Sequence, residues 1–260
     1  MAHRPQHKKA CKQRAAELYD EKLFKEVECE DCPICFQLLP LGDTKTFEPC
    51  CGKVICDGCI HTMKMNERKD LCAFCRTPTT YDYEEVIKRT KKLMDKGNGL
   101  AFSNLGICYF NGGMGLPKDY RKANELFLKA GELGCASGYY SLGNSYCVGK
   151  GVEVNKKKAI HYFELAAMMG SVEARHNLAC TEGQTCNFQR AYKHILIAAR
   201  AGHKISLEGV KRGFMTGDVS KDEYARTLRA YHERQKEMKS DARDKAAAYW
   251  ARRDQKKSRS

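Results

Sequence analysis

Residues 101–134 read AFSNLGICYFNGGMGLPKDYRKANELFLKAGELG, and residues 137–170 read SGYYSLGNSYCVGKGVEVNKKKAIHYFELAAMMG. The two stretches share one pattern: Leu105-Gly106 recurs as Leu142-Gly143, 37 residues later, and Lys122-Ala123 recurs as Lys158-Ala159, 36 residues later. A period of this length, with bulky and small residues at helical spacing, is typical of stacked helix pairs. The pattern predicts an all-α helix-pair solenoid.

Each half of the repeat has a physical role. The motif Leu-Gly-x-x-Tyr puts a bulky side chain and a position without a side chain on one helix face, so that a neighbouring helix can approach closely. A glycine-rich loop then reverses the chain, at residues 111–119 in the first copy and 148–155 in the second.

Two further copies follow with less of the pattern. The third, residues 173–202, lacks the glycine-rich loop but keeps the small and apolar positions Ala174, Leu178, Ala191, Ala198 and Gly202. The fourth runs from about residue 203 to residue 230 and has a turn at Thr216-Gly217-Asp218. Ser220 precedes Glu223 by three residues, which is the spacing of a helix capping box.

The pattern resembles the Sel-1-like repeat, a relative of the tetratricopeptide repeat. The resemblance implies a scaffold that binds a protein partner along its concave face. We expect repeats over residues 97–240, a connecting helix over 81–96 and a basic C-terminal helix or tail over 241–260. We expect this last helix to cap the open apolar end of the solenoid.

Residues 29–80 contain four pairs of cysteines: Cys32 and Cys35, Cys50 and Cys51, Cys56 and Cys59, Cys72 and Cys75. Three pairs have C-x-x-C spacing, which lets two sulfurs turn inward on a tight loop and hold one tetrahedral metal ion. The block predicts a small α+β module with two structural zinc ions. A thioredoxin-like redox site would need one C-x-x-C within an alternating strand and helix pattern, and no such pattern surrounds these pairs.

The motifs CPIC, PCCGKVICDGC and CAFCR resemble a RING finger, in which the cysteine pairs interleave. The resemblance implies a first zinc ion on Cys32, Cys35, Cys56 and Cys59, and a second on Cys50, Cys51, Cys72 and Cys75. The family has histidine where this chain has Lys53, and a lysine ammonium cannot bind zinc without losing its proton. Cys50 is the expected replacement, which makes this an all-cysteine variant. Cys29 is the expected bystander, because CPIC matches the family better than a pair that starts at Cys29.

RING ligases perform no covalent chemistry of their own; they orient a ubiquitin-conjugating enzyme charged with ubiquitin. Carried over to this sequence, the contact positions are Ile34, Met63, Ala73, Phe74 and Arg76. Ile34 matches the family's apolar residue, whereas Met63 and Ala73 depart from its bulky residue and its proline. Arg76 stands where the family has a cation that contacts both proteins. The alternatives are ordinary packing for Ile34 and a solvated charge for Arg76.

The chain has a formal net charge of +14 and 15 cysteines, an odd number. Basic residues gather in a leader over residues 1–28, which we expect to be helical, and in the C-terminal tail. No secretory signal and no apolar run of about 20 residues is present, so we expect an intracellular protein, cytoplasmic or nuclear, with reduced thiols and no membrane partner. Nucleic-acid binding has only the charge to support it.

The combined pattern predicts a RING-type ubiquitin ligase, or a ligase subunit, whose repeats bind a protein substrate. The alternative is a non-catalytic adaptor with a structural zinc module. The repeats contain no nucleotide-binding loop, serine nucleophile signature or paired metal carboxylates. His161, His176 and His194 occur singly on helical stretches, where we expect partly exposed or hydrogen-bonded side chains, so no catalytic residue is predicted.

Overall fold

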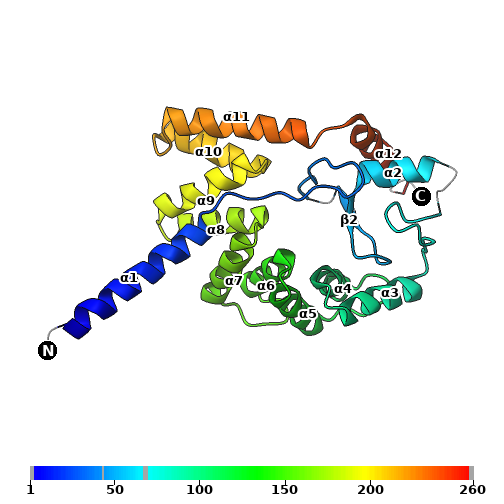
Figure 1. Cartoon of the computed structure of the whole chain (residues 1–260), viewed down its shortest axis with the longest axis horizontal. Coiled ribbons are helices and arrows are strands. Elements are labelled where there is room, and N and C mark those ends of the chain that lie inside the picture. Colours follow the sequence, from blue (N-terminus) through cyan, green and yellow to red (C-terminus); the bar gives the residue numbers. More distant parts are fainter. Residues whose placement is uncertain (1–2, 43, 67–69, 258–260) are drawn as a thin grey trace.

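The computed structural model describes residues 3–42, 44–66 and 70–257. In chain order the elements are α1 His3–Leu23, β1 Lys45–Phe47, β2 Val54–Cys56, α2 Asp57–Met65, α3 Tyr83–Asp95, α4 Gly99–Asn111, α5 Tyr120–Glu132, α6 Ala136–Val148, α7 Lys156–Met168, α8 Val172–Gln184, α9 Phe188–Arg200, α10 Lys204–Thr216, α11 Lys221–Glu237 and α12 Asp241–Lys257. Figure 1 shows α3 to α10 following one another along an arc, with the two strands and α2 on its inner side. Helix α11 runs back across the open side of the arc, and α12 packs against α2.

The repeat helices pack in sequential pairs, and their boundaries follow local chemistry. The side chains of Asn98, Asp119 and Asn155 accept hydrogen bonds from backbone amides in the first turns of α4, α5 and α7, as N-cap residues do. Gly112 and Gly149 end α4 and α6 in the left-handed conformation, which costs glycine nothing sterically. The two predicted glycine-rich loops therefore end the same helix of two successive repeats.

The glycine of the Leu-Gly motif lies at the closest approach between paired helices. A Cβ atom at Gly106 would lie 2.6 Å from the ring of Phe127, and one at Gly143 would lie 2.6 Å from the ring of Phe163. Both phenylalanines are buried, at 2% and 1% exposure. The predicted close packing is confirmed, and the aromatic rings of α5 and α7 fill the space that the missing side chains leave.

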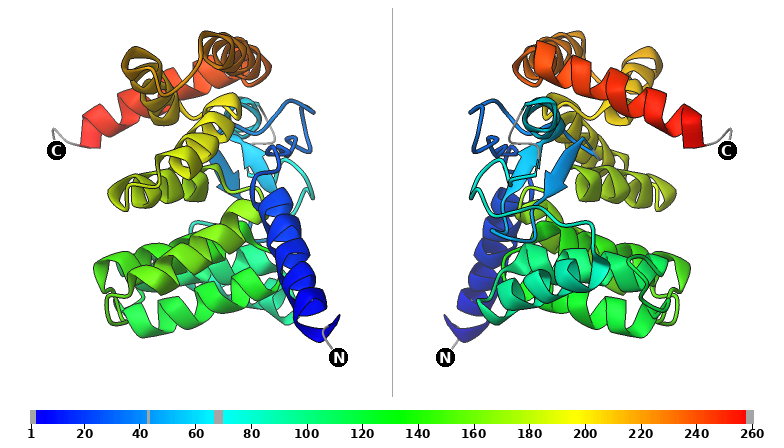
Figure 2. Two further views of the ribbon diagram at one scale, coloured as in Figure 1. Left: turned by 90° about the vertical axis from the view of Figure 1, so that its left-hand side faces the viewer. Right: turned by 90° about the vertical axis from the view of Figure 1, so that its right-hand side faces the viewer.

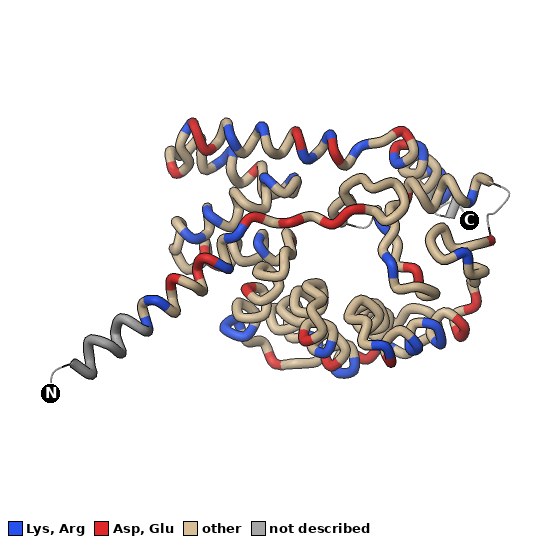
Figure 3. Tube along the Cα trace, in the orientation of Figure 1, with Lys and Arg blue, Asp and Glu red and all other residues tan. Residues whose placement is uncertain are grey.

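Helix α1 is anchored to the repeats at its C-terminal end and extends away from them at its N-terminal end (Figure 2). Leu23 is fully buried in the core of α7 and α8. The buried guanidinium of Arg175 in α8 donates hydrogen bonds to the carbonyl oxygens of Leu23, at 2.5 Å, and Lys25, at 2.6 Å. The extended segment that follows is acidic, with Glu26, Glu28, Glu30 and Asp31 (Figure 3). This segment carries the chain from the repeats to the cysteine-rich module.

The cysteine-rich module contains a two-stranded antiparallel sheet, in which Lys45 pairs with Cys56 and Phe47 with Val54. Helix α2 follows β2 directly. The module's small core is made of buried Cys32, Leu39, Ile55, Cys56, Ile60 and Ala73. The strand pair fits the small α+β module expected from the sequence.

The C-terminal helix differs from the expectation. It was expected to cap the open end of the solenoid, but α12 packs on α2 of the cysteine-rich module instead. Helix α11 covers the last repeat, packing against α9 and α10. Ser220 caps the N-terminus of α11: its hydroxyl accepts a hydrogen bond from the amide of Glu223 at 3.2 Å, as the capping spacing predicted. Because Gly58 in α2 has no side chain, α12 can pack closely against α2 at this position.

Candidate metal centre

Eight cysteines form two groups of four sulfurs, and within each group the sulfurs all lie within 4.8 Å of one another. The first cluster is Cys32, Cys35, Cys56 and Cys59; the second cluster is Cys50, Cys51, Cys72 and Cys75. These are the two sets that the sequence predicted. Along the chain the pairs alternate between the two clusters. Each cluster therefore joins two segments of the module that are separated in sequence by a pair from the other cluster.

The sulfur spacing fits a tetrahedral metal ion. In the first cluster, Cys32 and Cys59 are 3.9 Å apart and Cys35 and Cys56 are 3.8 Å apart. In the second cluster, Cys51 and Cys72 are 4.0 Å apart and Cys50 and Cys75 are 3.4 Å apart. Four sulfurs at about 2.3 Å from a central ion would be about 3.8 Å apart. Both clusters therefore have the dimensions of an S4 metal centre.

Lys53 does not take part in the second cluster. Its ammonium lies over the ring of Phe74, 5.7 Å from the ring centroid, while Cys50 occupies the fourth position beside Cys75. Cys50 and Cys51 thus both belong to the second cluster, where a RING finger has a cysteine and a histidine.

Two of the cysteine pairs lie on loops of the same geometry. In the first loop the amide of Cys32 donates to Gln37 O and the amide of Phe36 donates to Cys32 O. The second loop repeats this with Cys72, Thr77 and Arg76, forty positions later. The residue after the second cysteine is left-handed in both, with φ of 54° at Phe36 and 62° at Arg76. Each loop thereby contributes its two sulfurs to one cluster.

The thiols respond differently to this crowding. Burial acts to raise the pKa of Cys32, but backbone amides of Cys35, Cys56 and Ile34 donate to its sulfur and bring the pKa down to about 7. Burial also opposes the lowered pKa of Cys75, which hydrogen bonds from Thr77 bring to about 7. Burial raises the pKas of Cys50, Cys51, Cys56 and Cys59, and the neighbouring sulfurs add to the rise at Cys50 and Cys59. At Cys51 and Cys56, hydrogen bonds from the backbone amides of Lys53 and Cys59 oppose the effect of burial.

This arrangement suits a cation at each centre. Four thiolates this close repel one another, whereas a divalent ion between them attracts all four and keeps them deprotonated. Cysteine sulfur in tetrahedral groups of four is the donor set of zinc and iron–sulfur centres. The residues present therefore fit a structural metal ion in each cluster.

The five predicted contact residues are distributed unevenly over the module. Ile34 and Met63 are half-buried against the module's core, and Phe74 is 42% exposed. Arg76 is exposed, and its guanidinium lies 3.8 Å from the sulfur of Met63. Ala73 is only 5% exposed and belongs to the core. Arg76 and Met63 are therefore neighbours, Ile34 and Met63 pack against the same core, and on the second loop the exposed apolar side chain is Phe74 rather than Ala73.

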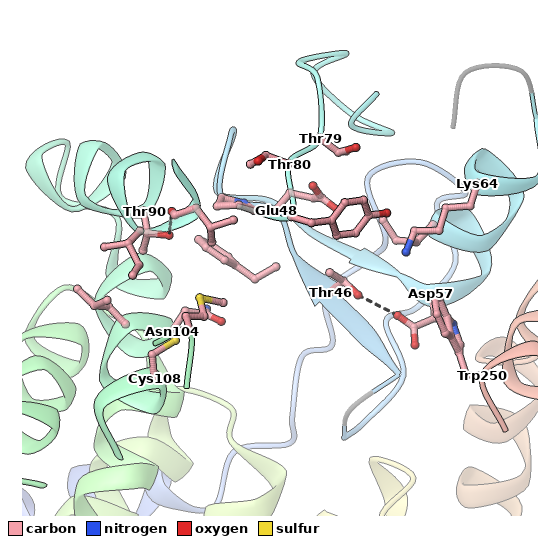
Figure 4. Close-up of a pocket in the computed structure, with 18 residues that line it drawn as sticks. Thr46, Glu48, Asp57, Lys64, Thr79, Thr80, Thr90, Asn104, Cys108 and Trp250 are labelled. Carbon is pink, nitrogen blue, oxygen red and sulfur yellow. Dashed lines mark hydrogen bonds between the residues drawn. The ribbon is translucent and has the colours of Figure 1, made fainter. Parts of the chain in front are cut away.

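A cavity of about 370 Å³ lies where the module, the first repeat and α12 meet (Figure 4). Thr90, Asn104 and Cys108 face it from α3 and α4, opposite Thr46 and Asp57, which share a hydrogen bond of 3.0 Å. Burial lowers the pKa of Lys64 at its edge and raises the pKas of Glu48 and Asp57. The residues that line the cavity come from segments far apart in the sequence, so no local motif predicts the cavity.

Sequence reasoning missed the arginines that hold the two cysteine loops. Arg243 of α12 donates to the carbonyl oxygen of Leu38, at 2.8 Å, and Arg89 of α3 donates to that of Pro78, at 2.7 Å. Leu38 and Pro78 hold equivalent positions, each in an isolated bridge that closes its loop. Both arginines lie in basic helical stretches, where nothing in the sequence separates them from solvated neighbours.

Other singled-out residues lie elsewhere. Cys29 is half-buried and belongs to neither metal-binding group. Cys108 is half-buried and Cys135 buried, whereas Cys147, Cys180 and Cys186 are exposed. Cys11 lies outside the residues whose side chains are described. His161 contacts the ring of Tyr162, at 5.4 Å between ring centroids.

The remaining histidines differ sharply in their surroundings. His176 is hydrogen-bonded to the Ser206 hydroxyl at 3.0 Å, as expected. His194 is fully buried, and neither ring nitrogen has a hydrogen-bond partner among the described residues. The expectation of a partly exposed or hydrogen-bonded side chain is therefore wrong for His194.

Three segments of the chain, residues 103–135, 136–171 and 172–203, match the family model of the Sel1 repeat. These segments are Sel1 repeats. The match confirms the first three predicted copies and their period, and it includes neither the predicted fourth copy nor the cysteine-rich module. Among curated proteins, the ERAD-associated E3 ubiquitin-protein ligase component HRD3B of Arabidopsis thaliana is 36% identical over 85 residues. That alignment covers 32% of this chain and only 13% of the relative.

Solved structures support the same fold. The Sel1 repeat protein from Oxalobacter formigenes superimposes with a TM-score of 0.51 at 22% identity, covering 57% of this chain and 64% of that one. The protective antigen c5321 of uropathogenic Escherichia coli, which has an SLR fold, gives a TM-score of 0.52 at 22% identity, covering 72% of this chain and 38% of that one. At this identity the likeness concerns the fold alone, a Sel1-type helical solenoid. Sel1 repeats indicate protein–protein interaction. Within the described residues no helix is long and apolar enough to span a membrane.

Proposed function

We propose that this protein is a RING-type ubiquitin ligase, or a subunit of one, with zinc in both cysteine clusters. The carrying observation is the pair of interleaved four-sulfur clusters, in which Cys50 takes the place of the usual histidine. Zinc is the ion of choice because it accepts four thiolates in tetrahedral geometry and has no redox chemistry of its own. Its role is structural: it fixes the loops that carry the docking residues.

The proposed docking surface for the conjugating enzyme comprises Ile34, Met63, Phe74 and Arg76. Arg76 follows the last zinc-binding cysteine, is exposed, and can donate to carbonyl oxygens of both ubiquitin and the enzyme. The left-handed backbone at Arg76 belongs to the metal-binding loop, so metal binding sets the direction of this side chain. The repeats would hold the protein to be modified. The similarity to HRD3B, which is a component of a ubiquitin ligase, is in keeping with this proposal, and the shared region covers only part of each chain.

The test is chain formation in vitro with purified full-length protein, ubiquitin, activating enzyme and a panel of conjugating enzymes. Ile34→Ala and Arg76→Ala should each reduce the rate strongly with every enzyme that supports it. Matched controls are Ile205→Ala and Arg212→Ala, which remove an exposed isoleucine and an exposed arginine from α10. Equal losses in control and test variants would contradict the docking surface.

The second candidate is a non-catalytic adaptor, in which the zinc module is a folding staple or a protein-docking surface. One observation favours it: Ala73 is buried, so the apolar residue that the family exposes at this position is absent. Absence of chain formation with the whole panel, together with metal binding and capture of a protein partner through the repeats, would establish the adaptor instead.

A further inference from the structure

The C-terminal helix reaches the first cluster through one side chain. The guanidinium of Arg243 donates to the carbonyl oxygens of Leu38, at 2.8 Å, and Gln37, at 3.4 Å, on the loop that carries Cys32 and Cys35. Its Nη2 also lies 3.7 Å from the sulfur of Cys35, a residue 208 positions away in sequence. A cation from the far end of the chain therefore faces a sulfur of the first cluster.

Arg243 packs against α2 at a glycine, Gly58. A Cβ atom at Gly58, between Cys56 and Cys59, would lie 2.8 Å from Cγ of Arg243 and 2.9 Å from its backbone nitrogen. Any side chain at Gly58 would push α12 away from the cluster.

The contact continues along both helices. His61 packs on Tyr249, with ring centroids 5.1 Å apart, and the ammonium of Lys64 lies 4.7 Å from the ring centroid of Trp250. Ala246 of α12 is fully buried. The arginine is thus held by an extended helix–helix contact and not by its own hydrogen bonds alone.

The chemistry of the cluster calls for such a cation. Four thiolates around one divalent ion carry a net charge of minus two, and a buried anion is stabilised by hydrogen-bond donors and by a nearby positive charge. Groups that hold metal ligands from outside typically change metal affinity about 10- to 100-fold when removed. Arg89 provides an internal comparison: it holds the equivalent carbonyl of the second loop, yet among the described residues it donates to Pro78 O and to Glu85 and to no sulfur.

We propose that α12 is a functional part of the first metal site, in which Arg243 balances the charge of the cysteine cluster, so that metal binding and docking of α12 stabilise each other. The inference rests on the proposed zinc content of the clusters. Because linkage is reciprocal, loss of metal from the first cluster weakens the docking of α12, and loss of docking weakens metal binding.

The experiment follows zinc transfer from full-length zinc-loaded protein to an excess of a chromophoric chelator. Arg243→Met should release one of two zinc ions about 10- to 100-fold faster than the parent protein. Arg252→Met, an exposed arginine on the same helix, should release both ions at the parental rate. Arg89→Met should leave the first-cluster ion unchanged, which cadmium-113 NMR can check because it resolves the two sites.

Two further measurements protect the test against simple misfolding. Gly58→Ala keeps the charge but displaces α12, so it should also speed the release of one zinc ion. The chain has one tryptophan, Trp250, so its fluorescence should shift to the red when the chelator removes the metal. Parental release rates in both Arg243→Met and Gly58→Ala would overturn the inference while leaving the metal centre intact. A parent protein that binds no zinc would overturn the metal centre itself.

Discussion

His194 should make the protein lose more stability in mild acid than the same protein without this side chain loses. The imidazole is fully buried in α9 against the ring of Phe24, at 4.7 Å between centroids. Burial, and after it the neighbouring cations Arg175, Arg190 and Lys193, lower its pKa to about 3 against an opposing effect of Asp20. The folded protein therefore keeps His194 neutral at a pH where the unfolded chain protonates it.

The sign and size follow from linkage. Because the folded pKa is depressed, the contribution is fully present above the unfolded pKa of about 6.5 and is lost as the pH falls toward the folded value. At pH 5.5 the unfolded chain gains about 1.4 kcal/mol from protonating this one group, and the folded state gains almost nothing. The free energy of unfolding should therefore fall by about 1.4 kcal/mol between pH 7.5 and pH 5.5 on account of His194.

The assay is urea denaturation of the parent protein and His194→Leu at both pH values. The comparison between them cancels the other titrating groups, including His176 and His203, whose pKas burial also lowers. The parent should lose about 1.4 kcal/mol more than the variant on acidification. An equal pH dependence in the two proteins, or an NMR titration of His194 near pH 6.5, would refute the reasoning.

Two other substitutions test the packing of the repeats. Gly143→Ala places a methyl group 2.6 Å from the ring of Phe163, so it should destabilise the protein by about 1–3 kcal/mol in the same denaturation assay. Gly183→Ala in α8 meets nothing within 4 Å and should be neutral or slightly stabilising; similar losses in both would contradict the close-approach argument. Arg175→Met removes both donors that hold Leu23 O and Lys25 O, so it should cost about 2–4 kcal/mol and speed proteolysis after residue 25. Unchanged proteolysis there would mean that Leu23 alone anchors α1.

The repeats and the four cysteine pairs could be predicted because their signals are local and recurrent, whereas the division of the pairs into two groups is what the resemblance to a RING finger implied. The recurrence of Leu105-Gly106 as Leu142-Gly143 predicts the packing face of a repeated helix from its spacing alone. Likewise, one C-x-x-C pair predicts two of the sulfurs of a metal site. Cys50 could be inferred because Lys53 cannot bind a metal ion as an ammonium. In these cases a few neighbouring residues contain the whole physical argument.

The remaining features depend on contacts between distant segments. Nothing near Arg243 indicates that its side chain faces Cys35, because Arg252 and Arg253 have similar surroundings in sequence and are exposed. Docking of α12 on α2 depends on the shape of the arc and on Gly58, whose position inside a C-x-x-C pair hid its packing role. Ala73 is buried in the core of the module, beside residues from other parts of the sequence. Such features require the three-dimensional course of the chain.

The most direct test of the central claim is the number of zinc ions per chain, measured by elemental analysis of metal-replete protein and checked by native mass spectrometry. We expect two zinc ions in the parent protein and about one in Cys50→Ser, because Cys50 completes the second cluster. One zinc ion in both proteins would contradict the assignment of Cys50 and leave the second cluster without metal.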